Sequence, residues 1–309
     1  MARISVSNEW SHLGEIVLGI APALYFPGVD PIEREPAAFM WRKVLSGVLY
    51  PFADGRRVPG WISRKYVAEL DRLHEVLIGH GVTVHRATAV TPLPGEPLGL
   101  GQMFARDPVF TVGDILVDGK LKMDMRHKER RGLVPLLSAF ARGGAHVVSV
   151  PSGDVFLEGG DVIVDLPYVY VGIGKYASNM DGVRWLQAQL GPQVNVVPVP
   201  LAVPGILHLD CCMTLIGEGL GIIHRDSLAH PLPHPLDTYK FIEIAGPARQ
   251  QLGTNVLVLD PVTIVVQQRH VQLQQQLRKK GFHVIPIEFN WHALLGGAFR
   301  CATAPLCRG

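Results

Sequence analysis

The sequence predicts an α/β fold in which one small module, roughly strand–strand–helix–strand, recurs about five times. Helix-like segments that end at a glycine are followed by short apolar strands, and turn residues divide several β-rich runs into strand pairs. No G-x-G-x-x-G fingerprint follows a strand, which argues against a doubly wound dinucleotide-binding sheet. Repetition with a long period instead favours radial or solenoid stacking of the modules.

Several segments are expected to form a helix followed by a strand. In each, the apolar spacing fits a helix with one buried face, and a closing glycine suits the left-handed residue that ends many helices. The clearest are residues 67–87, 134–150, 183–200 and 271–289, and residues 248–261 are a shorter candidate. These segments supply the helix and the last strand of the module.

Three β-rich runs with a central turn signal are expected to form strand pairs. They are residues 110–118, 161–172 and 209–224, with turns at Gly113-Asp114, Leu166-Pro167 and Gly217–Gly219. The run GEGLG at 217–221 has the glycine content of a phosphate-binding loop, but it lies between two strands, so a tight hairpin explains it better. The stretch PLPGEPLGLG, residues 92–101, is expected to be a surface loop that leads into the functional site.

The composition predicts a single large domain, residues 1–309. Hydrophobic residues make up 48% and charged residues 18% of the chain, which favours a sizeable core over disorder. No linker rich in proline, glycine or serine divides the sequence. The net charge is +2, and the densest basic stretch, HKERRG at 127–132, includes a glutamate. We interpret that stretch as a solvated helix start rather than a nucleic-acid contact.

Cysteine usage and the N-terminal residues predict a soluble, cytoplasmic protein with reduced thiols. Four cysteines in 309 residues are too few for a secreted disulfide framework. The N-terminus lacks the basic-then-apolar order of a signal peptide, and no apolar run reaches the ~18 residues of a membrane span. Neither a membrane nor a nucleic acid is therefore expected as a partner, and homodimer formation is left open.

Four short stretches place reactive side chains next to turn-forming residues. They are FARDPVF with Asp107, LEGGDVIV with Glu158 and Asp161, HLDCC with His208, Asp210, Cys211 and Cys212, and GGAFRC with Cys301. Taken singly, each fits a structural role such as a turn, a core histidine or small buried thiols. Each stretch, however, lies at the start of a different strand pair or at the chain end, and in a radial stack such positions converge on the central axis. Three carboxylates, one histidine and one thiol would then meet in a single cavity.

Such a set of side chains fits chemistry on a flat cation. Clustered carboxylates repel one another unless a cation lies among them, and a guanidinium offers several N–H donors to paired carboxylates. A cysteine becomes a strong nucleophile once its thiolate is favoured. A histidine, whose pKa lies near neutrality, can then move the protons.

Zinc binding and serine-hydrolase chemistry are weaker interpretations. HLDCC is dense in ligand-type residues, but strand alternation would place His208 and Asp210 on one face with Cys212 and would turn Cys211 away. No CxxC pair is present, so a structural zinc site is not expected. No GxSxG elbow is present to carry a serine nucleophile.

Taken together, RDPVF, EGGD, HLD and GGxxRC, in this order, resemble motifs of the guanidino-group-modifying enzymes. This superfamily includes arginine deiminases, dimethylarginine dimethylaminohydrolases and amidinotransferases. The resemblance spans nearly the whole chain, from NEWSHLGEIVLG to the terminal cysteine motif. It implies a five-module pseudosymmetric α/β-propeller, in agreement with the repeated module, and it implies neither a metal nor an organic cofactor.

The resemblance also implies a role for each matching residue. Cys301 attacks the guanidinium carbon and forms a covalent amidino-thioether. His208 is the general acid for the departing amine and then the general base for the acceptor. Asp107 and Asp210 each hold guanidinium nitrogens, and Glu158 orients His208 or binds a further nitrogen.

At the far end of the substrate the chain departs from the family pattern. After the strand VYVGIG, deiminases and dimethylarginine hydrolases typically have an arginine that binds the substrate carboxylate, and this chain has GKYASN. Lys175 and Arg126 are the candidates for that role, although Arg126 fits a surface residue equally well. Asp161 is expected to be structural and to fix the glycine turn that precedes it.

The leading hypothesis is a cysteine-dependent hydrolase of a small guanidino compound, arginine or a related guanidine, that releases ammonia or an alkylamine and leaves a ureido product. The first alternative is an amidinotransferase that passes the amidino group to an amine, because SNMDGVRWLQAQL and NEWSHLGEIVLG resemble that class. The second is a non-catalytic propeller that serves as a binding scaffold. It predicts loss of the nucleophile or of the carboxylates, and all of these are present.

Overall fold

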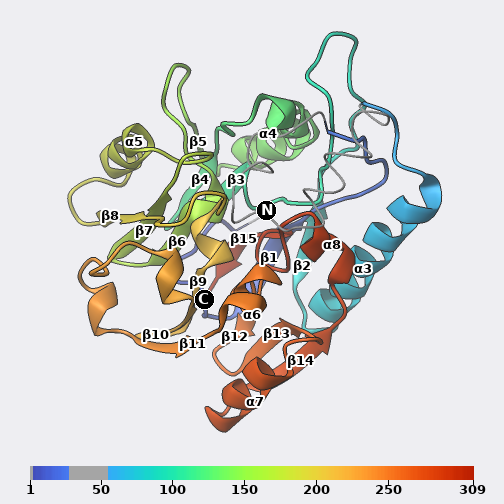
Figure 1. The fold of residues 1–309 in the computed structure, drawn as a ribbon. Coiled ribbons are helices and arrows are strands. Elements are labelled where there is room, and N and C mark those ends of the chain that lie inside the picture. The colour runs from blue at the N-terminus through green and yellow to red at the C-terminus, as the bar shows by residue number, and fades with distance from the viewer. Residues whose placement is uncertain (1–2, 28–54) are drawn as a thin grey trace.

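The computed structural model describes residues 3–27 and 55–309. Within these ranges the named strands form five three-stranded sheets, and the longer helices lie around the outside of them (Figure 1). Four sheets each use three consecutive strands, and the fifth combines strands from both ends of the chain. This repetition confirms the recurring α/β module; closure of the five sheets into a propeller ring stays a prediction.

The four consecutive sheets share one strand order. The first two strands of each run antiparallel, and the third returns parallel to the second. The strands are β3 (Val109–Val112), β4 (Ile115–Asp118) and β5 (His146–Ser149); β6 (Val162–Asp165), β7 (Tyr168–Ile173) and β8 (Asn195–Pro200); β9 (Met213–Gly217), β10 (Leu220–Ile223) and β11 (Lys240–Glu243); and β12 (Leu257–Asp260), β13 (Thr263–Gln267) and β14 (His283–Ile287). The three predicted strand pairs are therefore confirmed, and GEGLG forms the β9–β10 hairpin.

A parallel return needs a crossover, and helices supply it in three of these sheets. They are α4 (Val134–Arg142), α5 (Met180–Leu190) and α7 (Val271–Lys279), at the predicted positions. Between β10 and β11 the crossover instead contains two short 3-10 turns, η5 (Arg225–Ser227) and η6 (Leu236–Thr238), in a stretch where prolines interrupt helical hydrogen bonding. The predicted pair at 248–261 exists as α6 (Gly246–Gln250) and β12, but α6 joins two sheets. None of the described helices has both the length and the apolar character needed to cross a membrane.

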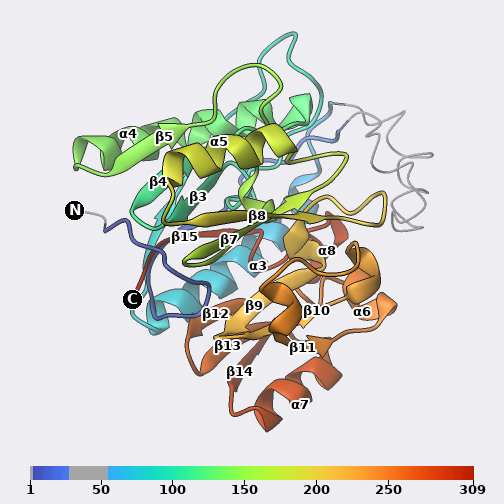
Figure 2. The ribbon, with the colours of Figure 1, turned by 90° about the vertical axis from the view of Figure 1, so that its left-hand side faces the viewer.

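The fifth sheet brings the two ends of the chain together. β15 (Thr303–Arg308) pairs antiparallel with β1 (Leu13–Leu18), which pairs parallel with β2 (Thr83–Arg86) after the crossover helix α3 (Gly60–Gly79). The described N-terminal segment and the C-terminus lie on the same side of the molecule (Figure 2). Upstream of β1, single β-bridges connect Val6 to Gly113 and Asn8 to Asp165. The N-terminal segment therefore ties the terminal sheet to two of its neighbours.

Apolar residues of the strands and helices form the core that supports the site. β6 and β7 are almost continuous apolar runs, and Ile163 and Tyr170 within them are fully buried. On α3, Leu70, Leu73 and Leu77 recur at helical spacing and form its buried face. Burial of each such leucine contributes about 1.5–3 kcal/mol to stability. The loops that lead into these strands are therefore anchored to a rigid core.

The expectation that the basic stretch 127–132 is solvated holds for His127 and Arg130, which are exposed, and is wrong for Lys128 and Glu129. The basic stretch 127–132 belongs to the 3-10 helix η2 (Asp124–Gly132), in which Lys128 and Glu129 are buried rather than solvated. Lys128 Nζ donates to backbone carbonyls, including that of Gly99 at 2.6 Å, and so attaches η2 to the loop 92–101. Backbone oxygens satisfy this charge, and a pattern of charged residues in the sequence cannot reveal them.

Candidate active site

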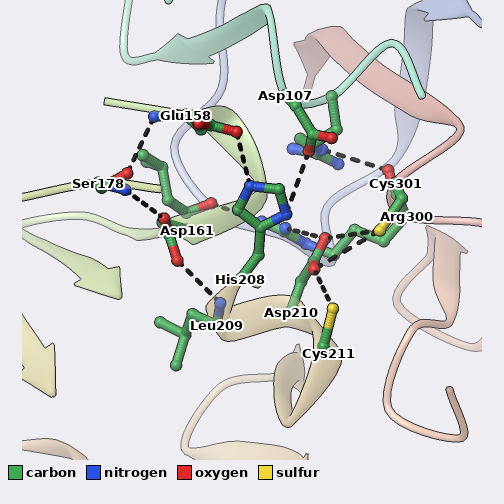
Figure 3. Close-up of polar contacts among 12 residues, drawn as sticks. Asp107, Glu158, Asp161, Ser178, His208, Leu209, Asp210, Cys211, Arg300 and Cys301 are labelled. Carbon is green, nitrogen blue, oxygen red and sulfur yellow. Dashed lines mark hydrogen bonds and ion pairs between the residues drawn. The ribbon is translucent and has the colours of Figure 1, made fainter. Parts of the chain in front are cut away.

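The structure brings the four predicted reactive stretches together in the interior (Figure 3). Asp107 lies just before β3, Glu158 before the 3-10 helix η3 (Gly159–Asp161), His208 before the 3-10 helix η4 (Leu209–Cys211), and Cys301 before β15. These side chains and that of Asp210 are at most 2% exposed. They form two groups, within each of which the ligand-type atoms lie within 4.8 Å of one another. We call them the imidazole cluster (Asp107, Glu158 and His208) and the thiol cluster (Asp210, Cys211 and Cys301).

In the imidazole cluster, His208 lies between two carboxylates (Figure 3). Its Nε2 donates to Glu158 Oε2 at 2.8 Å, and its Nδ1 lies 3.6 Å from Asp107 Oδ1. Gly160 allows this approach, because a Cβ there would lie 2.7 Å from Asp107 Oδ1 and from the His208 ring. The expected contact between Glu158 and His208 is therefore present, and the second glycine of EGGD is required by close packing.

The carboxylates keep His208 protonated. Burial opposes its protonation, but the negative charges of Asp107, Asp161 and Glu158 and the hydrogen bond to Glu158 outweigh burial and raise the pKa of His208 well above its usual value. The ring is therefore an imidazolium at neutral pH, which is the form that a general acid needs.

In the thiol cluster, two sulfur atoms face one carboxylate (Figure 3). Cys301 Sγ lies 3.4 Å from Asp210 Oδ2, and Cys211 Sγ lies 3.6 Å from Asp210 Oδ1. The neighbouring Cys211 thiol, burial and the negative charge of Asp210 together raise the pKa of Cys301 well above its usual value. The resting thiol is therefore neutral, and a cation bound nearby would favour the thiolate.

The structure contradicts the expected orientation of the consecutive cysteines. Cys211 faces the site, whereas Cys212 Sγ donates to the backbone carbonyl of Leu209 at 3.2 Å. Strand alternation does not apply here, because residues 209–211 form the 3-10 helix η4 and β9 begins only at Met213. Both thiols are buried, as predicted.

Asn255 is a neighbour of the thiol cluster that the sequence did not single out. Its Nδ2 donates to Cys301 Sγ at 3.0 Å, and its Oδ1 accepts from the backbone N of Cys301 at 3.1 Å. The residue is 1% exposed and lies between α6 and β12. An asparagine before an apolar strand is typical of many turns, so the sequence carries no distinctive signal for this position.

Arg300, directly before Cys301, holds Asp210 in place. Its Nη1 donates to Asp210 Oδ2 at 3.1 Å, and its Nη2 donates to Glu9 Oε1 at 2.9 Å. Burial opposes the charge of Arg300, but Glu9 and Asp210 outweigh it and raise the pKa of the guanidinium. The motif GGAFRC displays this arginine, yet its partner Glu9 lies near the other end of the chain, where no local pattern connects the two.

Arg126 is buried, so the interpretation as a surface residue is wrong. Its Nη1 donates to Asp107 Oδ2 at 2.8 Å and lies 3.9 Å from Glu158 Oε2. Its Nη2 donates to Glu129 Oε2 at 3.0 Å. This guanidinium therefore reaches the imidazole cluster and is shared among three carboxylates.

Lys175 is exposed. Its Nζ lies 4.9 Å from the centroid of the Tyr176 ring. Its backbone carbonyl accepts from Lys122 Nζ at 2.8 Å, and the backbone N of Lys122 donates to Glu158 Oε1 at 2.8 Å. Lys175 is thus linked to Glu158 through Lys122.

Asp161 is structural, as expected, but it acts on other loops and not only on its own turn. Its fully buried carboxylate accepts from the backbone N of Leu209 at 2.9 Å and from that of Ser178 at 3.1 Å. Asp161 therefore fixes η3 against η4 and so sets the positions of Glu158 and His208.

The two clusters fit a guanidinium better than a metal ion. In each, one carboxylate already accepts from an arginine, so a divalent cation would meet about twice the like-charge repulsion of a singly charged guanidinium. Asp107 Oδ1 is different, because it is buried and has no hydrogen-bond partner within the described part of the chain. An unpaired buried acceptor costs about 1–3 kcal/mol, which an N–H donor of a ligand would offset.

Comparisons with known proteins point to the same chemistry. A family model described as N,N dimethylarginine dimethylhydrolase, eukaryotic, matches residues 60–308. The uncharacterized protein YkgA of Bacillus subtilis (strain 168) is 31% identical, over 77% of this chain and 79% of that protein. The putative inosamine-phosphate amidinotransferase 2 of Streptomyces griseus is 26% identical, over 100% of this chain and 97% of that protein. The solved structure of inosamine-phosphate amidinotransferase StrB1 from Streptomyces griseus has the same fold, with a TM-score of 0.83, 21% identity, and coverage of 100% of this chain and 97% of that chain.

Proposed function

Because this chain belongs to the family that the N,N dimethylarginine dimethylhydrolase model describes, and so to the guanidino-modifying enzymes, we propose that it is a cysteine-dependent hydrolase of a small guanidino compound. Arginine or a related guanidine would lose ammonia or an alkylamine and leave a ureido product. One observation supports this best: a buried neutral thiol at Cys301 and a buried imidazolium at His208 lie next to the carboxylates of Asp107 and Asp210.

The substrate cation would bind between the two clusters. Asp107 Oδ1, which has no hydrogen-bond partner among the described residues, would accept one guanidinium N–H, and Asp210 would accept another. The positive charge of the substrate would lower the pKa of Cys301, so the thiol proton would leave to solvent as the substrate enters. Binding and activation of the nucleophile are thus one event in this proposal.

The chemistry then runs in two steps. Cys301 Sγ forms a bond to the guanidinium carbon, and the C–N bond breaks as His208 supplies the proton that the departing amine needs. Water attacks the resulting amidino-thioether, and the neutral His208 takes one proton from that water. The C–S bond then breaks, and the second proton of the water passes to the sulfur, which releases the ureido product and restores the neutral Cys301 thiol. Glu158 holds the ring in place through its 2.8 Å hydrogen bond.

Arg126 and Lys175 have different parts in this proposal. Arg126 is held by Asp107 and Glu129, and we assign it to position Asp107 rather than to bind the far end of the substrate. Lys175 is exposed and linked to Glu158 through Lys122, and we assign it to the anionic end of a substrate such as arginine.

An amidinotransferase is the second candidate, because a putative amidinotransferase is 26% identical over the whole of this chain. Both reactions share the amidino-thioether on Cys301 and differ in whether water or an amine removes it. The test is incubation with arginine, methylated arginines, agmatine and guanidino acids, with and without glycine or ornithine as an amine. A hydrolase forms ureido product without the amine, whereas product that appears only when the amine is supplied would replace hydrolysis with transfer.

A further inference from the structure

We propose that Asn255 is a positioning residue for Cys301 that also donates a hydrogen bond to the thiolate formed during the reaction. The inference rests on the proposed role of Cys301 as the nucleophile. It adds to the motif residues a side chain from the loop before β12, which no motif of the sequence includes.

The contacts of Asn255 fix which end of its amide faces the sulfur. One amide atom lies 3.1 Å from the backbone N of Cys301 and 3.2 Å from the backbone N of Ala298, and both of those groups are donors. Only an oxygen can accept from them, so that atom is Oδ1. The other atom is therefore Nδ2, which lies 3.0 Å from Cys301 Sγ and 3.3 Å from the backbone carbonyl of Asp210.

These four contacts join the two halves of the thiol site. Oδ1 binds the turn from Ala298 to Cys301, and Nδ2 reaches the carbonyl of Asp210 in η4. Because Asn255 is 1% exposed, water does not compete for these bonds. A side chain that holds both loops fixes the sulfur relative to the carboxylate of Asp210.

The donor at Nδ2 also opposes the effect of the carboxylate. Asp210 and Cys211 both favour the protonated form of Cys301, whereas an N–H aimed at the sulfur becomes stronger when the sulfur is an anion. A hydrogen bond to a charged group changes an equilibrium by about 10- to 100-fold. Asn255 therefore stabilises the thiolate after the substrate cation has displaced the proton.

A purely structural role of Asn255 predicts a different result from stabilisation of the thiolate, and two variants distinguish these two roles. Asn255→Asp keeps the oxygen that accepts from Ala298 and Cys301 and replaces the donor with a carboxylate, while Asn255→Ala removes both. If Asn255 only holds the turn, Asn255→Asp is the milder change. If it stabilises the thiolate, Asn255→Asp is at least as harmful as Asn255→Ala, because it places a negative charge beside the sulfur.

The measurement is the rate of Cys301 alkylation by iodoacetamide at neutral pH, located by peptide mass spectrometry, together with kcat and KM on any guanidine that is turned over. We expect alkylation and kcat to fall about 10- to 100-fold in both variants, with KM changed much less. Thr254→Val is the matched control, because Thr254 Oγ1 donates to the same Asp210 carbonyl at 3.0 Å without contacting the sulfur. It should lose stability and keep the alkylation rate.

The outcomes are distinct. An Asn255→Asp protein that alkylates faster than Asn255→Ala would overturn the thiolate role, and so would equal losses in Thr254→Val. If Asn255→Asp fails to fold, as judged by circular dichroism, the comparison of Asn255→Ala with Thr254→Val still decides. Alkylation needs no substrate, so a chain that hydrolyses no guanidine but shows the expected order would reject the proposed function and keep this inference.

Discussion

The imidazole cluster and the thiol cluster are built alike but differ in their resting charge. Each contains a carboxylate that accepts from a buried arginine, Asp107 in one and Asp210 in the other. In both, nearby negative charge favours the protonated form of the titratable group. For His208 that form is a cation, and for Cys301 it is a neutral thiol. The imidazole cluster is therefore ready to act as an acid at rest, while the thiol cluster needs an incoming cation before it can act as a nucleophile.

This difference protects the site when no substrate is present. Oxidation and alkylation of cysteine proceed through the thiolate, so a buried neutral thiol reacts slowly. A thiol that ionises only beside a cation is also selective, because a neutral ligand such as a ureido product does not activate it. The comparison of the clusters can be tested by changing one member at a time.

Removal of the nucleophile should have the largest effect. Cys301→Ala is expected to lower kcat by about 10⁴-fold or more, because the variant lacks the thiol that forms the proposed covalent intermediate. The matched control is Cys307→Ala, since Cys307 lies within β15, paired with β1, and is also buried and free. Steady-state kinetics and mass spectrometry of the trapped adduct would check this. An adduct that maps to Cys211 would show that Cys211, and not Cys301, is the nucleophile.

Loss of the ion pair that supports the thiol cluster should have the next largest effect. Glu9→Gln removes the carboxylate that accepts from Arg300 at 2.9 Å and leaves a buried charge with less compensation, so we expect a loss of about 3–5 kcal/mol in the free energy of unfolding. The control is Glu15→Gln, whose partly exposed side chain lies 3.1 Å from His85. Urea denaturation at neutral pH measures both.

The acid range gives a second readout for Glu9. Burial opposes its ionisation, but the positive charges of Arg300, Arg106 and Arg308 outweigh burial and lower its pKa to about 2. A carboxyl whose folded pKa lies below its unfolded value stabilises the fold above the unfolded pKa and loses that contribution as the pH falls toward 2. The wild-type protein should therefore lose stability between about pH 5 and pH 2, and Glu9→Gln should show a smaller loss there. Parallel acid curves for the two proteins would contradict the charge balance drawn around Arg300.

The imidazole cluster should respond with a shift in pH dependence. The rate rises with pH as the thiol ionises and falls as His208 loses its proton, so a bell-shaped profile of kcat/KM is expected. Glu158→Gln removes a negative charge and an anionic acceptor that favour the imidazolium, which lowers the pKa of His208. The alkaline limb should therefore move to lower pH, and the rate should fall about 100-fold.

The control for that variant is Glu129→Gln, which removes a carboxylate that contacts Arg126 but not the His208 ring. Stopped or continuous activity assays across the pH range would compare the alkaline limbs of the kcat/KM profiles of the two variants. An alkaline limb that stays in place in Glu158→Gln would mean that a group other than His208 sets it.

The predictable part of the site is the part encoded in short glycine-containing motifs. Asp107, Glu158 and His208 stand in the short motifs RDP, EGGD and HLD, which a reader of the sequence can find even though Gly160 packs against residues from distant segments. The chain segments that form the modules were equally visible, because helical and strand periodicities are local properties. That these site residues meet in the interior is seen only in the structure.

The unpredictable part depends on contacts between distant segments. Asn255 reaches Cys301 and Glu9 reaches Arg300 only after the sheets have assembled, and each looks like an ordinary turn or surface residue in its own stretch. The sheet formed by β1 and β15 joins the two ends of the chain, which no local pattern contains. The orientation predicted for Cys211 is wrong because a single 3-10 turn at 209–211 replaces the alternation that a strand would impose.

Removal of the Cys211 thiol should have the smallest effect, and it should raise the rate, whereas Cys301→Ala and Glu158→Gln lower it. The neighbouring Cys211 thiol is the largest of the influences that raise the pKa of the Cys301 thiol. Cys211→Ala removes that thiol, so the acid limb of kcat/KM should move to lower pH and the neutral-pH rate should rise about 2- to 10-fold. Cys212→Ala is the matched control, because this neighbouring buried thiol bonds to the carbonyl of Leu209 instead. If Cys211→Ala slows the reaction while Cys212→Ala does not, the second thiol supports the thiolate, and the thiol cluster would be as ready at rest as the imidazole cluster.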